Sequence, residues 1–229
     1  MIIGGFQRFS LIDYPGKTCA VIFTRGCGFR CKYCHNPELV IPEKYSAKIG
    51  LESIMTFLEG RRNKLDAVTI SGGEPTDQID IEPVIGDLKR MEFLIKLDTN
   101  GTRPEVLKSL IEMEMIDYVA MDVKGPFEKY EDITGCYVDT EKIKESIDIV
   151  LNSGVDHEFR TTVASEILSE EDLLKIAMMI TGAKRYYLQT FTSSKMICTE
   201  PSALSPLPIK DMQSCARKIR GYVKDCRVR

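Results

Sequence analysis

Short apolar runs rich in β-branched residues recur along this chain, and each is followed by a turn and then by apolar residues at helical spacing. This alternation predicts repeated strand-helix units. The six predicted strands cover residues 20–24, 67–71, 94–98, 118–123, 158–163 and 186–189. Because these runs are almost continuously apolar, we expect parallel strands that are covered on both faces.

The helices between these strands carry their own start and stop signals. The helix after the third strand has the clearest start, because Thr102 and Glu105 form a capping-box pattern and Pro104 lies in the first turn. A further helix is expected over about 140–152, with Gly154 as a left-handed cap beyond its end.

The remaining units complete an α/β fold. Ser169 is predicted to cap the next helix, and a last helix is predicted over about 209–226. Six strand-helix units in a row form either an open sheet or a partial barrel, since right-handed crossovers allow both. We predict a single-domain partial (β/α)6 barrel that spans residues 1–229.

Polar and small residues collect where the predicted strands end, and this favours the barrel. Cys27 follows the first strand, Gly72-Gly73-Glu74-Pro75 the second, Asn100-Gly101 the third and Lys124 the fourth. In both arrangements of parallel strands, ligands bind at the carboxyl ends. We therefore expect one site at that edge.

Charge and hydropathy narrow the possible partners. Lysine and arginine total 31 against 34 acidic residues, so no excess of positive charge is available to neutralise a nucleic-acid backbone. The first ten residues lack the basic start and apolar run of a signal peptide, and no stretch approaches the roughly 20 apolar residues that span a bilayer. We expect a cytoplasmic protein whose partners include neither nucleic acid nor membrane.

Eight cysteines in a cytoplasmic chain indicate metal ligation or burial rather than disulfides. Three of them, Cys27, Cys31 and Cys34, stand close together at a CxxxCxxC spacing. The others are isolated in the sequence and are predicted to be small buried hydrophobic residues. They are Cys19, Cys136, Cys198, Cys215 and Cys226.

The CxxxCxxC loop has several chemical interpretations. Thiolates suit iron–sulfur clusters or zinc, and three thiolates on a four-iron cluster leave one iron open to a small molecule. A structural zinc site with His35 as fourth ligand is an alternative, although the neighbouring side chains of Cys34 and His35 diverge. A ferredoxin-like electron carrier is a second alternative, but a fourth nearby cysteine is missing.

The cysteine motif, followed by Gly72-Gly73-Glu74-Pro75 at the next strand end, resembles the radical S-adenosylmethionine (SAM) superfamily, and the resemblance extends across most of the chain. More narrowly, residues 10–16, 23–27 and 34–37 resemble activating proteins of the anaerobic, glycyl-radical ribonucleotide reductase. Between Cys34 and Gly72 there is no cysteine, so the ferredoxin-like insert of some other activators is absent.

The resemblance implies two cofactors, a [4Fe-4S] cluster held by Cys27, Cys31 and Cys34, and SAM on the open iron. An electron from the cluster divides SAM into methionine and a 5′-deoxyadenosyl radical, without a further catalytic residue. The implied contacts of SAM are Gly72, Gly73 and Glu74 at the methionine end, Tyr33 at the adenine, Asp122 and Lys124 at the carboxylate or ribose, Arg160 and Gln189 at the ribose and adenine, and His35 and Asn100 beside the cluster.

The same resemblance implies an activity and partners. The enzyme would be an activase that generates a glycyl radical on a larger partner, first of all anaerobic ribonucleotide reductase. An external donor such as flavodoxin or ferredoxin would supply the electron. Two alternatives stay open: a radical SAM enzyme acting on a nucleoside or cofactor precursor, and a zinc-stapled interaction protein.

Overall fold

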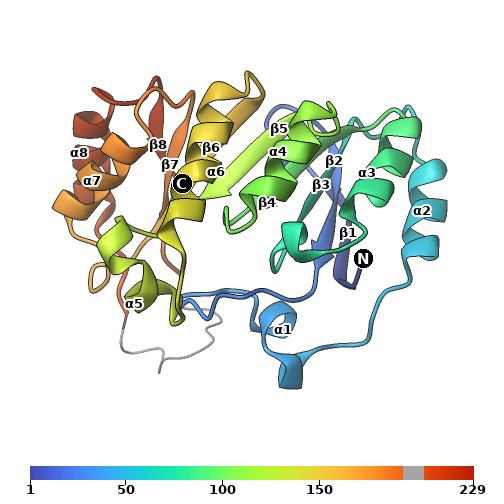
Figure 1. Cartoon of the computed structure of the whole chain (residues 1–229), viewed down its shortest axis with the longest axis horizontal. Helices are drawn as coiled ribbons and strands as arrows, with labels where there is room; N and C mark the ends of the chain where they lie inside the picture. The colour runs from blue at the N-terminus through green and yellow to red at the C-terminus, as the bar shows by residue number, and fades with distance from the viewer. Residues whose placement is uncertain (193–203) are drawn as a thin grey trace.

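One eight-stranded sheet forms the centre of the molecule, in a computed structural model that describes residues 1–192 and 204–229 (Figure 1). The strands pair in sequence order. They are β1 (Ile3–Ser10), β2 (Cys19–Thr24), β3 (Ala67–Gly72), β4 (Leu94–Thr99), β5 (Tyr118–Asp122), β6 (Asp156–Val163), β7 (Tyr186–Thr190) and β8 (Cys226–Val228). β1 is antiparallel to β2, and all later pairs are parallel. The α/β fold and the partial barrel are confirmed.

The six predicted strands are present with ends shifted by one or two residues, but the two edge strands were not predicted. β1 contains Gly4, Gly5 and the polar pair Gln7 and Arg8, so it lacks the apolar run that marks the other strands. β8 has three residues and offers too short a pattern. Both are recognisable only from their pairing with β2 and β7.

Helices cover the outer face of the curved sheet (Figure 1). They are α1 (Pro37–Val40), α2 (Leu51–Glu59), α3 (Ile81–Arg90), α4 (Pro104–Glu112), α5 (Tyr130–Thr134), α6 (Thr140–Asn152), α7 (Glu170–Met179) and α8 (Ile209–Ile219). Short 3-10 turns cover Pro42–Lys44, Pro75–Asp77 and Phe127–Lys129. In the described part of the chain, no helix combines the length and the apolar character that crossing a membrane requires.

Two of the predicted helix caps are confirmed. Ser169 accepts a hydrogen bond from the backbone N–H of Asp172 and begins α7 with a complete capping box. Gly154 lies just beyond α6 with φ of +78°, in the left-handed region that glycine adopts without strain.

Two predicted helix ends are wrong. The N-cap of α4 is Arg103, one residue later than predicted, and its side chain makes no cap bond. The hydroxyl of Thr102, the predicted cap, instead donates to Asn100 Oδ1 at 2.7 Å. The predicted Thr102–Glu105 capping box is therefore absent, although Pro104 does begin the helix. The last helix ends at Ile219 rather than near 226, since Cys226–Val228 pairs with β7.

The two faces of the sheet differ in polarity. Ile22, Ile70 and Leu97 belong to the main hydrophobic core, and all three are fully buried. The alternate residues of the same strands face the inside of the barrel, where Lys96 and Asp98 lie. The inner face also carries a second, smaller apolar cluster that includes Val21, Tyr118 and Ala120, all of them buried. The prediction that the strands are covered on both faces therefore holds at this cluster, and the charged residues of the inner face were not predicted.

The isolated cysteines do not all share one environment. Cys19, Cys215 and Cys226 are buried, as predicted. Cys136 is only partly buried, because it lies between the exposed residues Gly135 and Tyr137, and its thiol lies 3.7 Å from Thr134 Oγ1. Cys198 lies outside the described residues.

Candidate functional site

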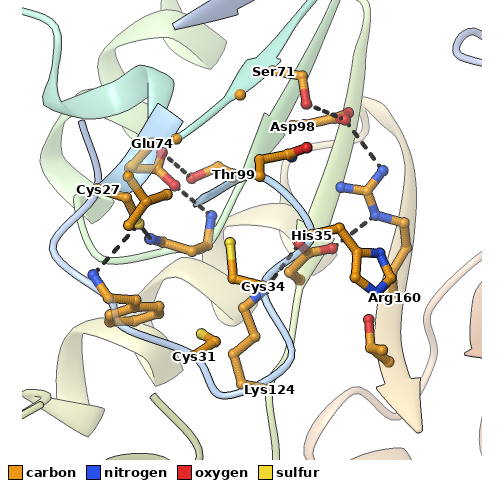
Figure 2. Close-up of a pocket in the computed structure, with 18 of the residues that line it drawn as sticks. Cys27, Cys31, Cys34, His35, Ser71, Glu74, Asp98, Thr99, Lys124 and Arg160 are labelled. Carbon is orange, nitrogen blue, oxygen red and sulfur yellow. Dashed lines mark hydrogen bonds and ion pairs between the residues drawn. The ribbon is translucent and has the colours of Figure 1, made fainter. Parts of the chain in front are cut away.

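The three clustered cysteines lie on the loop that joins β2 to α1, and they line one cavity of about 260 Å³ at the carboxyl ends of the parallel strands (Figure 2). Every predicted site residue lines this cavity. They are Cys27, Cys31, Tyr33, Cys34, His35, Gly72, Gly73, Glu74, Asn100, Asp122, Lys124, Arg160 and Gln189. Segments 160 residues apart in sequence are thus brought together by the strand order.

Backbone hydrogen bonds fix the start of the cysteine loop against the next strand end. Gly73 N–H donates to Thr24 O at 2.9 Å, and Glu74 N–H donates to Gly26 O at 2.8 Å. The approach is so close that a Cβ on Gly73 would lie 1.9 Å from Gly26 O. Gly72 adopts φ of +116°, which L side chains rarely adopt. Glycine is therefore needed at both positions because the start of the cysteine loop lies so close to them, and not only because the chain turns there.

Glu74 joins two strand ends through its carboxylate. It is fully buried, and its Oε1 accepts hydrogen bonds from the hydroxyls of Thr76 at 2.6 Å and Thr99 at 2.8 Å. Its Oε2 accepts from the backbone N–H of Asn100 at 2.7 Å (Figure 2). Burial raises the pKa of Glu74 to about 7, although these donors favour the charged form. Glu74 thus fastens the loop after β3 to the loop after β4.

Donors point at the first sulfur of the motif. Phe29 N–H lies 3.4 Å from Cys27 Sγ, and Asn100 Nδ2 lies 3.7 Å from it. Burial raises the pKa of the Cys27 thiol to about 12 and that of the Cys31 thiol to about 11. Buried thiols of this kind ionise readily only when a cationic partner, such as a metal ion or the iron of a cluster, binds the sulfur and displaces the proton. Hydrogen-bond donors directed at the sulfur stabilise the thiolate form.

A row of alternating charges crosses the inner face of the barrel beside the thiols. Lys96 pairs with Asp98. Arg160 contacts both Asp98 at 3.2 Å and Asp122 at 2.8 Å, and Figure 2 shows the Arg160 side chain directed at Asp98. Lys124 Nζ lies 3.0 Å from Asp122. Burial by itself would raise the pKa of Asp122, but Arg160 and Lys124 hold that pKa well below its usual range. Three cations and two anions leave the row with a net positive charge.

Two polar atoms at the cavity are buried without a hydrogen-bond partner among the described residues, the hydroxyl of Tyr33 and Nε2 of His35. Burial raises the pKa of Tyr33 well above its usual value and lowers that of His35. Unpaired buried polar atoms are rare in folded proteins, so they indicate a polar ligand in the cavity. The residues present therefore fit a cluster with a polar organic cofactor.

The structure also adds residues that the sequence did not single out. Ser71, Asp98, Thr99 and Thr162 line the same cavity. Asp98 and Thr99 stand directly before Asn100, but the predicted strand 94–98 treats Asp98 only as the end of an apolar run and does not include Thr99. The inward alternation of polar residues along β4 was the signal that could have identified Asp98.

Comparison with known proteins gives consistent results. Residues 21–180 match the sequence profile of the Radical SAM superfamily. A protein of Methanocaldococcus jannaschii with the provisional name glycyl-radical enzyme activating enzyme is 35% identical over 235 residues, which cover 100% of this chain and 95% of that protein. Pyruvate formate-lyase-activating enzyme of Staphylococcus aureus is 33% identical over 100 residues, covering 42% of this chain and 39% of that enzyme.

A solved structure supports the fold. Streptococcus suis SuiB bound to S-adenosylmethionine superposes with a TM-score of 0.70 at 13% identity. The match covers 91% of this chain and 49% of SuiB, so this chain spans about half the length of that protein.

Proposed function

Because this chain belongs to the radical SAM superfamily, we propose that it is an activase which generates a glycyl radical on a larger partner protein. Anaerobic ribonucleotide reductase is the first candidate partner, on the resemblance carried by residues 10–16, 23–27 and 34–37. The observation that carries the proposal is the single cavity in which three thiols, the row of charges and two unpaired polar atoms meet.

The cysteine loop would hold a [4Fe-4S] cluster through Cys27, Cys31 and Cys34. With one electron from an external donor such as flavodoxin or ferredoxin, the bound cluster and SAM would supply the radical chemistry that removes one hydrogen atom from the target glycine and releases methionine and 5′-deoxyadenosine. A low-potential cluster of this kind suits a reducing compartment such as the cytoplasm.

The row of charged side chains would orient SAM and offset the negative charge of the thiolates that hold the cluster. Lys124 lies nearest the cysteine loop, and its positive charge stabilises the Cys31 thiolate. The same ammonium group is available to the carboxylate of SAM, while Asp122 fixes its position. Arg160 holds Asp122 from the other side and lines the cavity where a ribose would lie.

Gly73 and Glu74 would act mainly on the loop. By joining the strand ends through Gly26 and Asn100, they preorganise the cysteines before any cofactor binds. Tyr33 and His35 offer their unpaired polar atoms to the adenine or ribose.

The test begins with anaerobic reconstitution, followed by iron and sulfide analysis. The expected result is four irons and four sulfides for each chain, cleavage of SAM after reduction, and a glycine-centred doublet in electron paramagnetic resonance when the candidate partner is added. Cys31→Ala should lose the cluster, whereas Cys215→Ala on α8 should keep it.

Two outcomes would overturn the proposal. One zinc ion for each chain, without sulfide, would identify an interaction protein with a structural zinc site. A cluster that cleaves SAM only in the presence of a nucleoside or cofactor precursor, with no doublet on any glycyl-radical protein, would identify a small-molecule enzyme.

A further inference from the structure

A second cavity, of about 430 Å³, adjoins the first inside the barrel. Arg160 and Gln189 line both cavities, so they form part of the wall between them. Ile12 and Asp13 lie at the second cavity, on the segment that joins β1 to β2. Ile12 is 84% exposed, which places this cavity at an opening to solvent.

The charged side chains of the second cavity already have partners. Lys96 pairs with Asp98, which also contacts Arg160. Glu158 accepts a hydrogen bond from the Tyr118 hydroxyl at 2.7 Å and lies 3.3 Å from Arg229 Nη1. Arg229 is partly exposed, but Lys96, Arg160 and Glu158 lie in the barrel interior. A charged ligand would have to displace their partners, and breaking such a pair leaves an uncompensated charge. The cavity therefore favours an uncharged ligand.

Two neutral side chains in the same region do have free hydrogen-bonding capacity. Thr162 on β6 and Gln189 on β7 are direct neighbours in the strand register, and both are partly exposed. Neither side chain has a hydrogen-bond partner in residues 1–192 or 204–229. The glutamine amide offers two donors and an acceptor, and the threonine hydroxyl offers one donor and two acceptors.

We propose that Gln189 and Thr162 bind the main chain of the partner segment that carries the target glycine, an inference that rests on the proposed activase function. A peptide main chain presents one N–H donor and one C=O acceptor at each residue and carries no charge. It therefore matches the two neighbouring neutral groups. The segment enters from the second cavity and brings the glycine Cα to the first, where Thr162 and Gln189 also lie.

The probe is the pentapeptide acetyl-Ala-Ala-Gly-Ala-Ala-amide with two deuterons on the glycine Cα. Peptide binding to the reconstituted protein with SAM and without reductant is followed by nuclear magnetic resonance titration, and deuterium in 5′-deoxyadenosine is measured by mass spectrometry after reduction. Gln189→Ala should raise the peptide Kd about tenfold, because two hydrogen bonds are lost. Thr162→Val should raise it about threefold to fivefold, whereas Thr162→Ser, which keeps the hydroxyl, should restore binding.

One control variant and four outcomes distinguish a failure of peptide binding by Gln189 and Thr162 from a failure of the activase function. Gln213→Ala, on the exposed side of α8, should leave peptide binding unchanged. If the wild-type chain transfers deuterium and Gln189→Ala and Thr162→Val bind the peptide as tightly as it does, this inference is wrong and the activase stands. If Gln189→Ala weakens SAM binding but not peptide binding, Gln189 contacts the cofactor instead. If the wild-type chain cleaves SAM but transfers no deuterium and also raises no glycine-centred doublet on the candidate partner, the activase proposal itself fails. If it raises the doublet but neither binds the peptide nor takes deuterium from it, the activase stands and this inference is wrong.

Discussion

Replacing Gly73 by alanine tests the contact between the cysteine loop and the strand end beside it. An added Cβ would lie 1.9 Å from Gly26 O and 2.6 Å from Gly26 C, both of them backbone atoms. Ordinary contact begins at about 3.4 Å, so the two segments would have to separate by more than 1 Å. That movement would break the hydrogen bond from Glu74 N–H to Gly26 O.

The cost can be compared with substitutions of two glycines of the cysteine loop, Gly26 and Gly28. Overpacking of this severity costs about 3 kcal/mol or more, which in a chain of this size lowers Tm by roughly 6–12 °C. Gly26 has φ of +98° but open space around it, so Gly26→Ala should cost about 1–2 kcal/mol through backbone strain alone. Gly28 has no positive φ, and a Cβ added there would meet no atom within 4 Å among residues 1–192 and 204–229, so Gly28→Ala should stay within about 0.5 kcal/mol.

The assay is urea unfolding of the metal-free proteins at one pH, followed by iron analysis after anaerobic reconstitution. The expected order of stability is Gly28→Ala, then Gly26→Ala, then Gly73→Ala, and the last variant should also bind less iron. Equal stability of Gly73→Ala and Gly28→Ala would refute the reasoning, because close approach would then carry no energetic cost.

Three further predictions concern buried ionisable groups. Glu74→Gln places an amide N–H donor against the buried N–H of Asn100 and should cost about 3 kcal/mol in urea unfolding. Glu105→Gln at the exposed start of α4 should cost almost nothing. Equal unfolding midpoints for the two variants would contradict the role of Glu74 in joining the two loops. Arg160→Leu removes the cation that Asp98 and Asp122 share and leaves each of these buried carboxylates with one lysine partner. The change should cost about 3 kcal/mol at pH 8 but less at pH 5, where protonation of the carboxylates offsets the lost charge; the same loss at both pH values would argue against this pairing. Burial lowers the pKa of His157 below 6.5, so below that pH the unfolded chain takes up a proton that the folded chain refuses. Glu74, whose pKa is raised to about 7, changes stability in the opposite direction over this pH range, so the quantity to measure is the difference between the wild type and His157→Gln. The stability of the wild type relative to His157→Gln should fall by up to about 1.4 kcal/mol per pH unit below pH 6.5, and a difference that does not change with pH would rule out this histidine.

Local patterns predicted most of the fold because they act within a few residues. Six strands, the cap at Ser169 and the left-handed Gly154 follow from side-chain periodicity and from φ preferences. The capping box at Thr102 failed because Asn100, two residues earlier, accepts the same hydroxyl. The edge strand β1 was missed because its residues become a strand only beside β2.

In the candidate site too, local spacing was predictable from the sequence and contacts between strands were not. The CxxxCxxC spacing and the Gly72-Gly73-Glu74 run pointed to the cavity from the sequence, since spacing and residue type select metal chemistry. The partners of Glu74 could not be deduced, because Thr99 and Asn100 reach it from the next strand.

The sequence by itself determined the order of strands and helices, the cysteine loop and the edge at which the site lies, because these depend on short-range spacing and on the handedness of crossovers. Only the tertiary structure decided that the inner face of the barrel is charged and how its charges pair. Lys96, Asp98, Asp122 and Arg160 come from three strands, and strand register brings them into contact. The same register places Thr162 and Gln189 side by side, and neither side chain has a hydrogen-bond partner within residues 1–192 and 204–229.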